Sequence, residues 1–128
     1  MSTPDIRSYA EFWPYYVRAH RKPQTRIVHA VGTSIGTTVA VTGLLMGKKG
    51  MIPLGLAIGY GFAWYSHFFI EGNKPATFGH PLYSFASDWV MLSKMLRGTM
   101  DAEVERVTAQ AVEVTPAAAP VAADGLQN

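Results

Sequence analysis

Residues 27–70 decide the fold, and they read IVHAVGTSIGTTVAVTGLLM (27–46), GKKG (47–50) and MIPLGLAIGYGFAWYSHFFI (51–70). The first and last of these stretches have twenty residues each and no formal charge at neutral pH. As a helix, each would be roughly 30 Å long, which matches the hydrocarbon core of a bilayer. Because the GKKG turn is short, the sequence predicts a two-helix transmembrane hairpin. A buried hairpin of a soluble protein is the alternative, since the first stretch is rich in threonine.

The composition agrees with a membrane protein. Hydrophobic residues make up 48% of the chain and charged residues only 16%, whereas soluble domains carry about 25% charged residues. The basic residues flank the apolar stretches and form no long stripe, so they favour contact with anionic lipids over nucleic acid. The chain has no cysteine, which excludes disulfides, thiolate metal sites and covalent haem attachment.

Two amphipathic segments flank the hairpin, at residues 8–20 and 82–98. Both are expected to be helices at the membrane interface, where tryptophan and tyrosine are favoured, and Pro14 is expected to kink the first. Residues 108–128 are rich in Ala and Pro and show no helical periodicity, so we expect a disordered tail. The resulting prediction is an all-α membrane protein, with a membrane-embedded helical domain at 1–107 and a tail at 108–128.

The arrangement of the hairpin in the membrane follows from its charges and its small residues. Only Lys48 and Lys49 lie at the turn, whereas the other basic residues of the membrane domain lie on the side of the two flanks. The positive-inside rule therefore predicts an integral, multi-pass protein with both termini in the cytoplasm. Glycines spaced four residues apart in each stretch predict close helix packing, and they are also compatible with a homodimer.

Four histidines are the strongest functional signal. His29 lies near the start of the first stretch and His67 near the end of the second, and these two ends are neighbours in an antiparallel hairpin. His20 and His80 lie just outside on the same side, so all four imidazoles are expected to converge in one layer. A site made of histidines without cysteine suits iron, zinc, copper or nickel. Histidines that contact only lipid headgroups, a b-type haem ligated by two of them, and a non-catalytic membrane scaffold are the alternatives.

Charged residues beside the histidines are weaker candidates. Glu71 is expected either to be a further metal ligand, or to orient His67, or to be a solvated interfacial charge. Arg21 and Arg26, together with Arg18, are candidates to bind a substrate carboxylate; contact with lipid headgroups is the alternative. Asp88 reaches this site only if its helix folds back onto the hairpin.

Sequence motifs around the histidines resemble those of a known family. They are His20-Arg21-Lys22-Pro23 followed by His29 and Gly32, then His67 followed by Glu71-Gly72-Asn73-Lys74-Pro75-Ala76, and then Thr77-Phe78-Gly79-His80-Pro81-Leu82. In order and spacing, over roughly residues 8–105, they resemble the 2-hydroxy fatty acid dioxygenase-like family, long catalogued as a domain of unknown function. Lys22 and Thr25 stand where asparagines are frequent in that family.

The resemblance implies an activity. The fungal member is a multi-pass membrane enzyme that uses Fe(II) and O2 to convert a 2-hydroxy fatty acid into an acid one carbon shorter, in fatty acid α-oxidation, a part of lipid metabolism. Its essential histidines fall on His20, His29, His67 and His80, which are therefore the expected catalytic and metal-binding residues. A lipid-like 2-hydroxy acid is the expected substrate and membrane lipids the expected surroundings.

Overall fold

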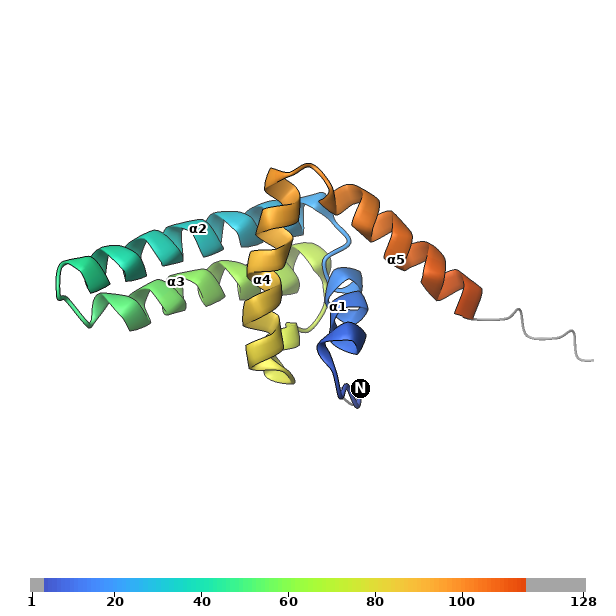
Figure 1. Cartoon of the computed structure of the whole chain (residues 1–128), viewed down its shortest axis with the longest axis horizontal. Coiled ribbons are helices and arrows are strands. Elements are labelled where there is room, and N and C mark those ends of the chain that lie inside the picture. Colours follow the sequence, from blue (N-terminus) through green and yellow to red (C-terminus); the bar gives the residue numbers. More distant parts are fainter. Residues whose placement is uncertain (1–3, 115–128) are drawn as a thin grey trace, which may run out of the picture.

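The computed structural model describes residues 4–114, and over these residues it contains helices and no strands (Figure 1). The elements are α1 (Tyr9–Arg18), α2 (Pro23–Leu45), α3 (Met51–Tyr65), the π-helix η1 (Ser66–Glu71), the 3₁₀ helix η2 (Ala76–Phe78), α4 (Pro81–Leu96) and α5 (Met100–Val114). The predicted all-α class is confirmed for the described part of the chain.

Helices α2 and α3 lie side by side and run antiparallel, and the turn between them is at the end farthest from the other helices (Figure 1). A Cβ added at Gly36 would collide with the carbonyl oxygen of Gly55, and one added at Gly55 would collide with that of Gly36. Only glycine permits this approach, so the predicted close packing is confirmed. These glycines face the neighbouring helix of the same chain, and the homodimer therefore stays a prediction.

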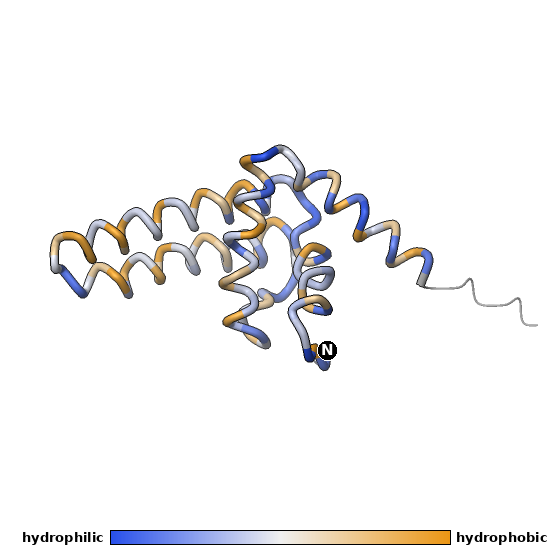
Figure 2. Tube along the Cα trace, in the orientation of Figure 1, coloured by the Kyte–Doolittle hydropathy of each residue, from blue (hydrophilic) through white to orange (hydrophobic). Residues whose placement is uncertain are grey.

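Helix α2 is, among the described helices, the one that is long and apolar enough to cross a membrane. Its 23 residues give a length of about 34 Å. The 15 residues of α3 give only about 22 Å, because the predicted second span, 51–70, changes to a π-helix after Tyr65. The transmembrane crossing of the second helix therefore stays a prediction. In Figure 2, apolar residues (orange) alternate with pale, near-neutral ones along the hairpin, and the hydrophilic turn lies at its tip.

Helices α1, α4 and α5 form the hydrophobic core at the open end of the hairpin. The core consists of Phe12, Tyr16, Val17, Ala76, Met91, Met100 and Val107. The helix predicted at 8–20 is present as α1. Ser8 caps its start, and the Ser8 hydroxyl accepts a hydrogen bond from the Glu11 amide. The helix continues through Pro14 to Arg18. Its aromatic face was expected at the membrane interface, but it is buried against protein, with Phe12 and Tyr16 fully inaccessible.

Helix α4 is the second predicted amphipathic helix, and it crosses the hairpin close to α1 (Figure 1). The face that packs against the protein carries Ser84, Ser87 and Met91. Its apolar face is exposed instead, with Leu82 at 82% and Leu96 at 81%. That exposed face is the one that remains free for lipid.

Helix α5 corrects the predicted domain boundary. The expectation that residues from 108 onward lack regular structure is wrong for 108–114, because α5 ends at Val114. Met100 and Val107 of this helix are buried in the core, and the indole N–H of Trp13 donates a hydrogen bond of 2.7 Å to Glu103. Packing of this apolar face against α1 therefore stabilises the helix. The rest of the predicted tail, 115–128, lies outside the described residues.

Candidate metal centre

Three histidines from three parts of the chain meet at the base of the hairpin. The ring centroids of His20 and His67 are 4.5 Å apart, those of His20 and His29 are 4.8 Å apart, and those of His29 and His67 are 5.5 Å apart. One nitrogen from each ring lies within 4.8 Å of the other two. All three side chains are buried, with at most 4% exposed. The predicted convergence is confirmed for these three residues.

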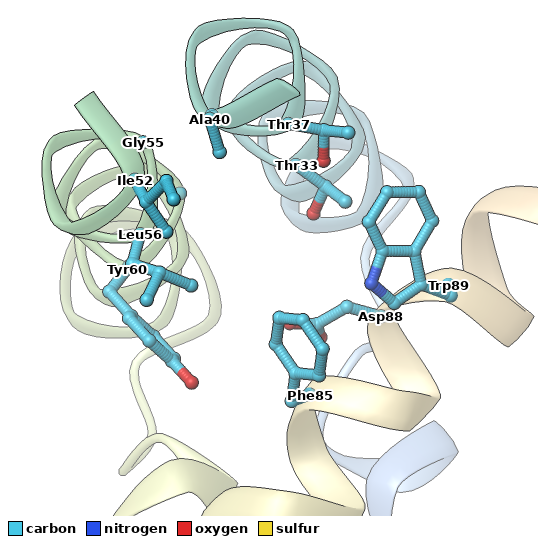
Figure 3. A pocket seen from close by; sticks show the side chains of 12 residues that line it. Thr33, Thr37, Ala40, Ile52, Gly55, Leu56, Tyr60, Phe85, Asp88 and Trp89 are labelled. Carbon is cyan, nitrogen blue, oxygen red and sulfur yellow. The ribbon is translucent and has the colours of Figure 1, made fainter. Parts of the chain in front are cut away.

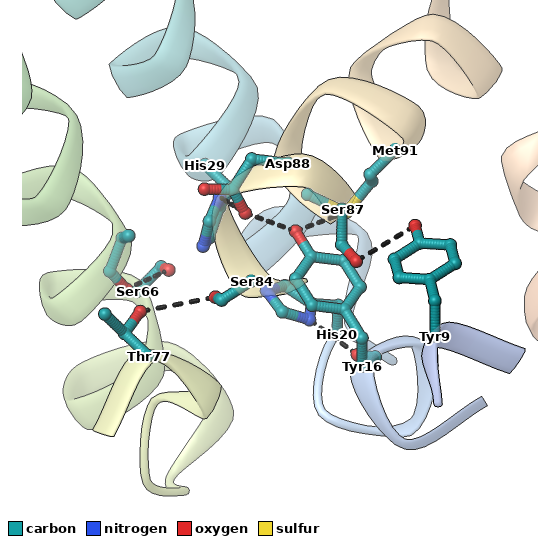
Figure 4. A network of polar contacts seen from close by, with 11 residues as sticks. Tyr9, Tyr16, His20, His29, Ser66, Thr77, Ser84, Ser87, Asp88 and Met91 are labelled. Atoms are coloured by element: carbon teal, nitrogen blue, oxygen red, sulfur yellow. Dashed lines mark hydrogen bonds and ion pairs between the residues drawn. The ribbon is translucent and has the colours of Figure 1, made fainter. Parts of the chain in front are cut away.

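His20 is held by the end of α1. It follows the last turn of that helix, and its Nδ1 lies 2.7 Å from the carbonyl oxygen of Tyr16, with the two rings stacked at 4.0 Å (Figure 4). A carbonyl only accepts hydrogen bonds, so Nδ1 carries the proton and Nε2 has a free lone pair. Nε2 is buried without a hydrogen-bond partner. Burial, followed by the proximity of His29 and His67, lowers the pKa of His20 well below its ordinary value, which keeps the ring neutral.

His67 is positioned by the π-helix and the turn that ends it. Gly72 has a φ of +78°, a conformation that favours glycine, and both Gly72 and Asn73 donate backbone hydrogen bonds to the His67 carbonyl. The chain thereby folds back, and the Asn73 side chain reaches the His67 ring, with Oδ1 at 2.8 Å from Nδ1. The Asn73 amide nitrogen donates to the Ala19 carbonyl, which fixes the amide orientation. His67 Nδ1 is therefore the donor, and its Nε2 is free to bind a metal.

His29 projects from the first turns of α2 toward α4. Its Nδ1 lies 3.5 Å from Oδ1 of Asp88, and that carboxylate oxygen accepts a hydrogen bond of 2.6 Å from the Tyr16 hydroxyl (Figure 4). Asp88 is 12% exposed, and burial raises its pKa to about 7, although the hydrogen bond from Tyr16 opposes that rise. A carboxylate beside a histidine is the arrangement that orients histidine ligands in metal sites.

His80, the fourth predicted histidine, is not part of this group. It precedes α4 and contacts the rings of Phe12 and Tyr83 at centroid distances of 5.6 and 6.2 Å. Its Nε2 is buried without a partner. The geometry thus brings together three of the four predicted ligands.

Of the charged residues predicted beside the histidines, Glu71 and Arg26 both make hydrogen bonds within the protein. Glu71 accepts hydrogen bonds from the Lys22 amide and the Thr25 hydroxyl, so it ties the start of α2 to η1, and the residue that orients His67 is Asn73. Arg26 is buried and donates to the carbonyls of His20 and Arg21 and to Asp101. Its guanidinium therefore already holds the loop that carries His20.

Arg21 is exposed and lies directly after His20. Among the arginines considered for a substrate carboxylate, it and Arg18 are exposed, whereas Arg26 is buried. Sequence reasoning missed two contributors to the site, Tyr16 and Asn73. The signal for Asn73 was its position directly after Gly72, within reach of the histidine that precedes the turn.

An apolar cavity of about 250 Å³ lies beside the histidines, between α2, α3 and α4 (Figure 3). It is lined by Thr33, Gly36, Thr37, Ala40, Ile52, Gly55, Leu56, Gly59, Tyr60, Phe85, Asp88 and Trp89. Asp88 belongs to both places, because it lines the cavity and lies against His29. Asp88 therefore connects the cavity to the cluster, although none of the three histidines lines the cavity itself.

The residues present fit a metal ion. Three buried neutral imidazoles, two of them with the proton fixed on the nitrogen away from the cluster, offer the donors that iron, zinc, copper and nickel accept. Three protein ligands leave further coordination positions for exogenous molecules, as in catalytic metal sites. Fold and site together define a helical protein with a buried cluster of three histidines at the base of a hairpin.

Comparison with protein-family models identifies the family of this chain. The chain belongs to the family described as 2-hydroxy-palmitic acid dioxygenase Mpo1-like, whose model matches residues 6–100, so the resemblance seen in the sequence motifs is confirmed. Neither the curated proteins nor the solved structures gave a match to this chain. Membership places the chain among proteins named for dioxygenase activity on a 2-hydroxy fatty acid.

Proposed function

We propose that the protein is an Fe(II)-dependent dioxygenase that shortens 2-hydroxy fatty acids by one carbon. The observation that carries the proposal is the buried cluster of His20, His29 and His67 in a chain of the dioxygenase family. Buried polar atoms without partners cost free energy, and Nε2 of His20, the nitrogen that carries the free lone pair, has none. A metal ion that accepts this lone pair removes that cost.

Each side chain has a role in this proposal. His20, His29 and His67 would hold the iron, which would supply the redox chemistry that breaks the C1–C2 bond of the substrate. One O2 takes up the four electrons of this cleavage, and the carboxyl carbon leaves as CO2 together with one water. Asn73 keeps the proton of His67 on Nδ1. The Tyr16 hydroxyl donates a hydrogen bond to Asp88, and this carboxylate lies beside Nδ1 of His29. Arg21 is exposed and directly follows His20 in the chain, and we propose that it binds the substrate carboxylate, since a guanidinium pairs well with carboxylates.

The proposed surroundings are a membrane. We propose that the hairpin is embedded with its Lys48–Lys49 turn on the far side and both termini in the cytoplasm. Large apolar side chains are exposed along the hairpin, and they include Ile27, Val31, Ile35, Val41, Leu44, Leu45, Leu54 and Leu56. An exposed apolar surface of this extent is typical of membrane contact. The histidine cluster then lies near the cytoplasmic interface, where a fatty acid head group resides.

The geometry favours a single ion over a b-type haem. Haem ligation by two histidines needs their nitrogens on opposite faces of a flat macrocycle. In this structure three rings lie edge to face around one point, and their centroids are 4.5–5.5 Å apart. No porphyrin fits between rings that already touch.

Metal analysis of purified protein tests the proposal. We expect about one iron per chain after anaerobic ferrous loading, and loss of that iron in His67→Ala. His80→Ala is the matched control, because this histidine lies outside the cluster, and it should keep its iron. Loaded wild-type protein should consume O2 with a 2-hydroxy acid and release the acid one carbon shorter. Full iron occupancy in His67→Ala, or zinc alone in the wild type, would overturn the assignment.

A further inference from the structure

We infer that the cavity between α2, α3 and α4 holds the hydrocarbon chain of the substrate, and that Thr37 sets how long that chain can be. This inference rests on the proposed function, since it assigns the tail of the molecule whose head group binds at the histidines. The cavity meets the cluster at Asp88, which lines the cavity and lies 3.5 Å from His29. A ligand with its head at the cluster therefore has its tail directed into the cavity.

The walls of the cavity suit an alkyl chain. On the hairpin side, Gly36, Gly55 and Gly59 carry no side chain, which leaves a smooth floor. Phe85 and Trp89 form the opposite wall on α4, and Figure 3 shows the open space between these two walls. A flexible apolar chain buries its surface well in such a slot.

The lining residues place the cavity along the hairpin axis. On α2 they are Thr33, Gly36, Thr37 and Ala40, which follow His29 at intervals of about one helical turn. From His29 to Ala40 is eleven residues, or about 16 Å of helix. Carbon–carbon bonds of about 1.5 Å at tetrahedral angles advance an extended chain by roughly 1.25 Å per carbon, so about 13 chain carbons reach from the cluster to the far end of the cavity. The structure thus points to long-chain 2-hydroxy acids.

Thr37 is the side chain at which this length can be altered. It points into the cavity from α2 (Figure 3), three residues before Ala40, so a bulky side chain there closes the last 4.5 Å or so, about three to four carbons. Each methylene that loses its burial weakens binding about fourfold. We therefore expect Thr37→Phe to weaken binding of long acids roughly 60- to 250-fold, and to leave acids that are four carbons shorter unaffected.

Thr38→Phe is the matched control. Thr38 is the next residue of the same helix, has the same side chain, and is exposed outside the cavity. It should bind acids of every length as the wild type does. Equal chain-length preferences in Thr37→Phe and Thr38→Phe would overturn the inference.

Photo-crosslinking of the full chain locates the tail without relying on turnover. A 16-carbon 2-hydroxy acid with a diazirine at its last carbon should label the far end of the cavity, at Ala40 or Ile52. The same acid with the diazirine near its head should label α4 around Asp88. Labelling by both probes on the outer face, at Leu45 or Leu54, would overturn the inference. Cavity labelling by a protein that fails to bind iron would instead refute the oxygenase proposal and leave the chain site standing.

Discussion

Replacing Asn73 by alanine is expected to weaken metal binding by about 10- to 100-fold, the usual effect of losing a residue that orients a histidine ligand. Each tenfold step corresponds to about 1.4 kcal/mol, so the expected loss of binding free energy is about 1.4–2.8 kcal/mol. The reason lies in two hydrogen bonds. Asn73 accepts from His67 Nδ1 at 2.8 Å and donates to the Ala19 carbonyl at 3.0 Å. Alanine removes both and lets the His67 ring rotate.

The same change should also lower the stability of the metal-free protein. It leaves His67 Nδ1 and the Ala19 carbonyl without their partners, and an unsatisfied buried polar group costs about 1–3 kcal/mol. Water that enters at the half-buried Asn73 position recovers part of this cost. The expected loss of unfolding free energy is therefore about 1–3 kcal/mol in total.

Anaerobic competition between the protein and a chelator of known Fe(II) affinity measures the effect. Glu71→Gln is the matched control, because Glu71 lies in the same segment but bonds the Lys22 amide and the Thr25 hydroxyl instead of the His67 ring. Its iron affinity should stay within about threefold of the wild type, well short of the loss expected for a residue that orients a ligand. Unchanged affinity in Asn73→Ala, or a larger loss in Glu71→Gln than in Asn73→Ala, would refute the assignment of Asn73 as the orienting residue.

Two further predictions concern packing and pH. Gly36→Leu should separate α2 from α3, because a side chain there meets the Gly55 carbonyl, and overpacking of this kind costs about 1–3 kcal/mol. Gly61→Leu, at an open position on α3, should leave the stability unchanged. Equal thermal stability of the two variants in detergent would contradict this packing. The Arg106 hydrogen bond lowers the pKa of Glu103 from 4.5 to about 2, so its contribution to stability is present above pH 4.5 and is lost as the pH falls toward 2. Acid titration of unfolding should therefore show a smaller decline between pH 4.5 and 2 in Glu103→Gln, and identical acid limbs would exclude this role.

The hairpin and the histidine cluster could be predicted because their signals are local and periodic. Two apolar stretches around a four-residue turn leave little choice but an antiparallel pair, and that pairing brings His29 and His67 to the same end. The position of His20 just before the hairpin placed it on the same side. The glycine contacts also followed from sequence, since small residues at helical spacing identify a close interface.

Most of the remaining parts depend on tertiary contacts that no local pattern encodes. His80 was expected in the cluster because it follows the hairpin, but the turn around Ala76 directs it to Phe12 instead. Helix α5 was not predicted, although Met100, Val104 and Val107 follow one another at helical spacing, because the predicted segment ended at residue 98 and the chain after 107 was expected to be a disordered tail. The position of Asp88 depended on the direction of α4, which the sequence left open.

The π-helix η1 makes the site sensitive to the number of residues in this segment as well as to their identity. Adjacent residues of a helix differ by about 100° around its axis, so deleting one of Phe68, Phe69 or Ile70 would turn Gly72 and Asn73 to another side of His67. The hydrogen bond that fixes the His67 proton would then be lost although every named side chain was still present. Chains with the same histidines but a different count between His67 and the glycine turn would therefore carry the motif without the geometry.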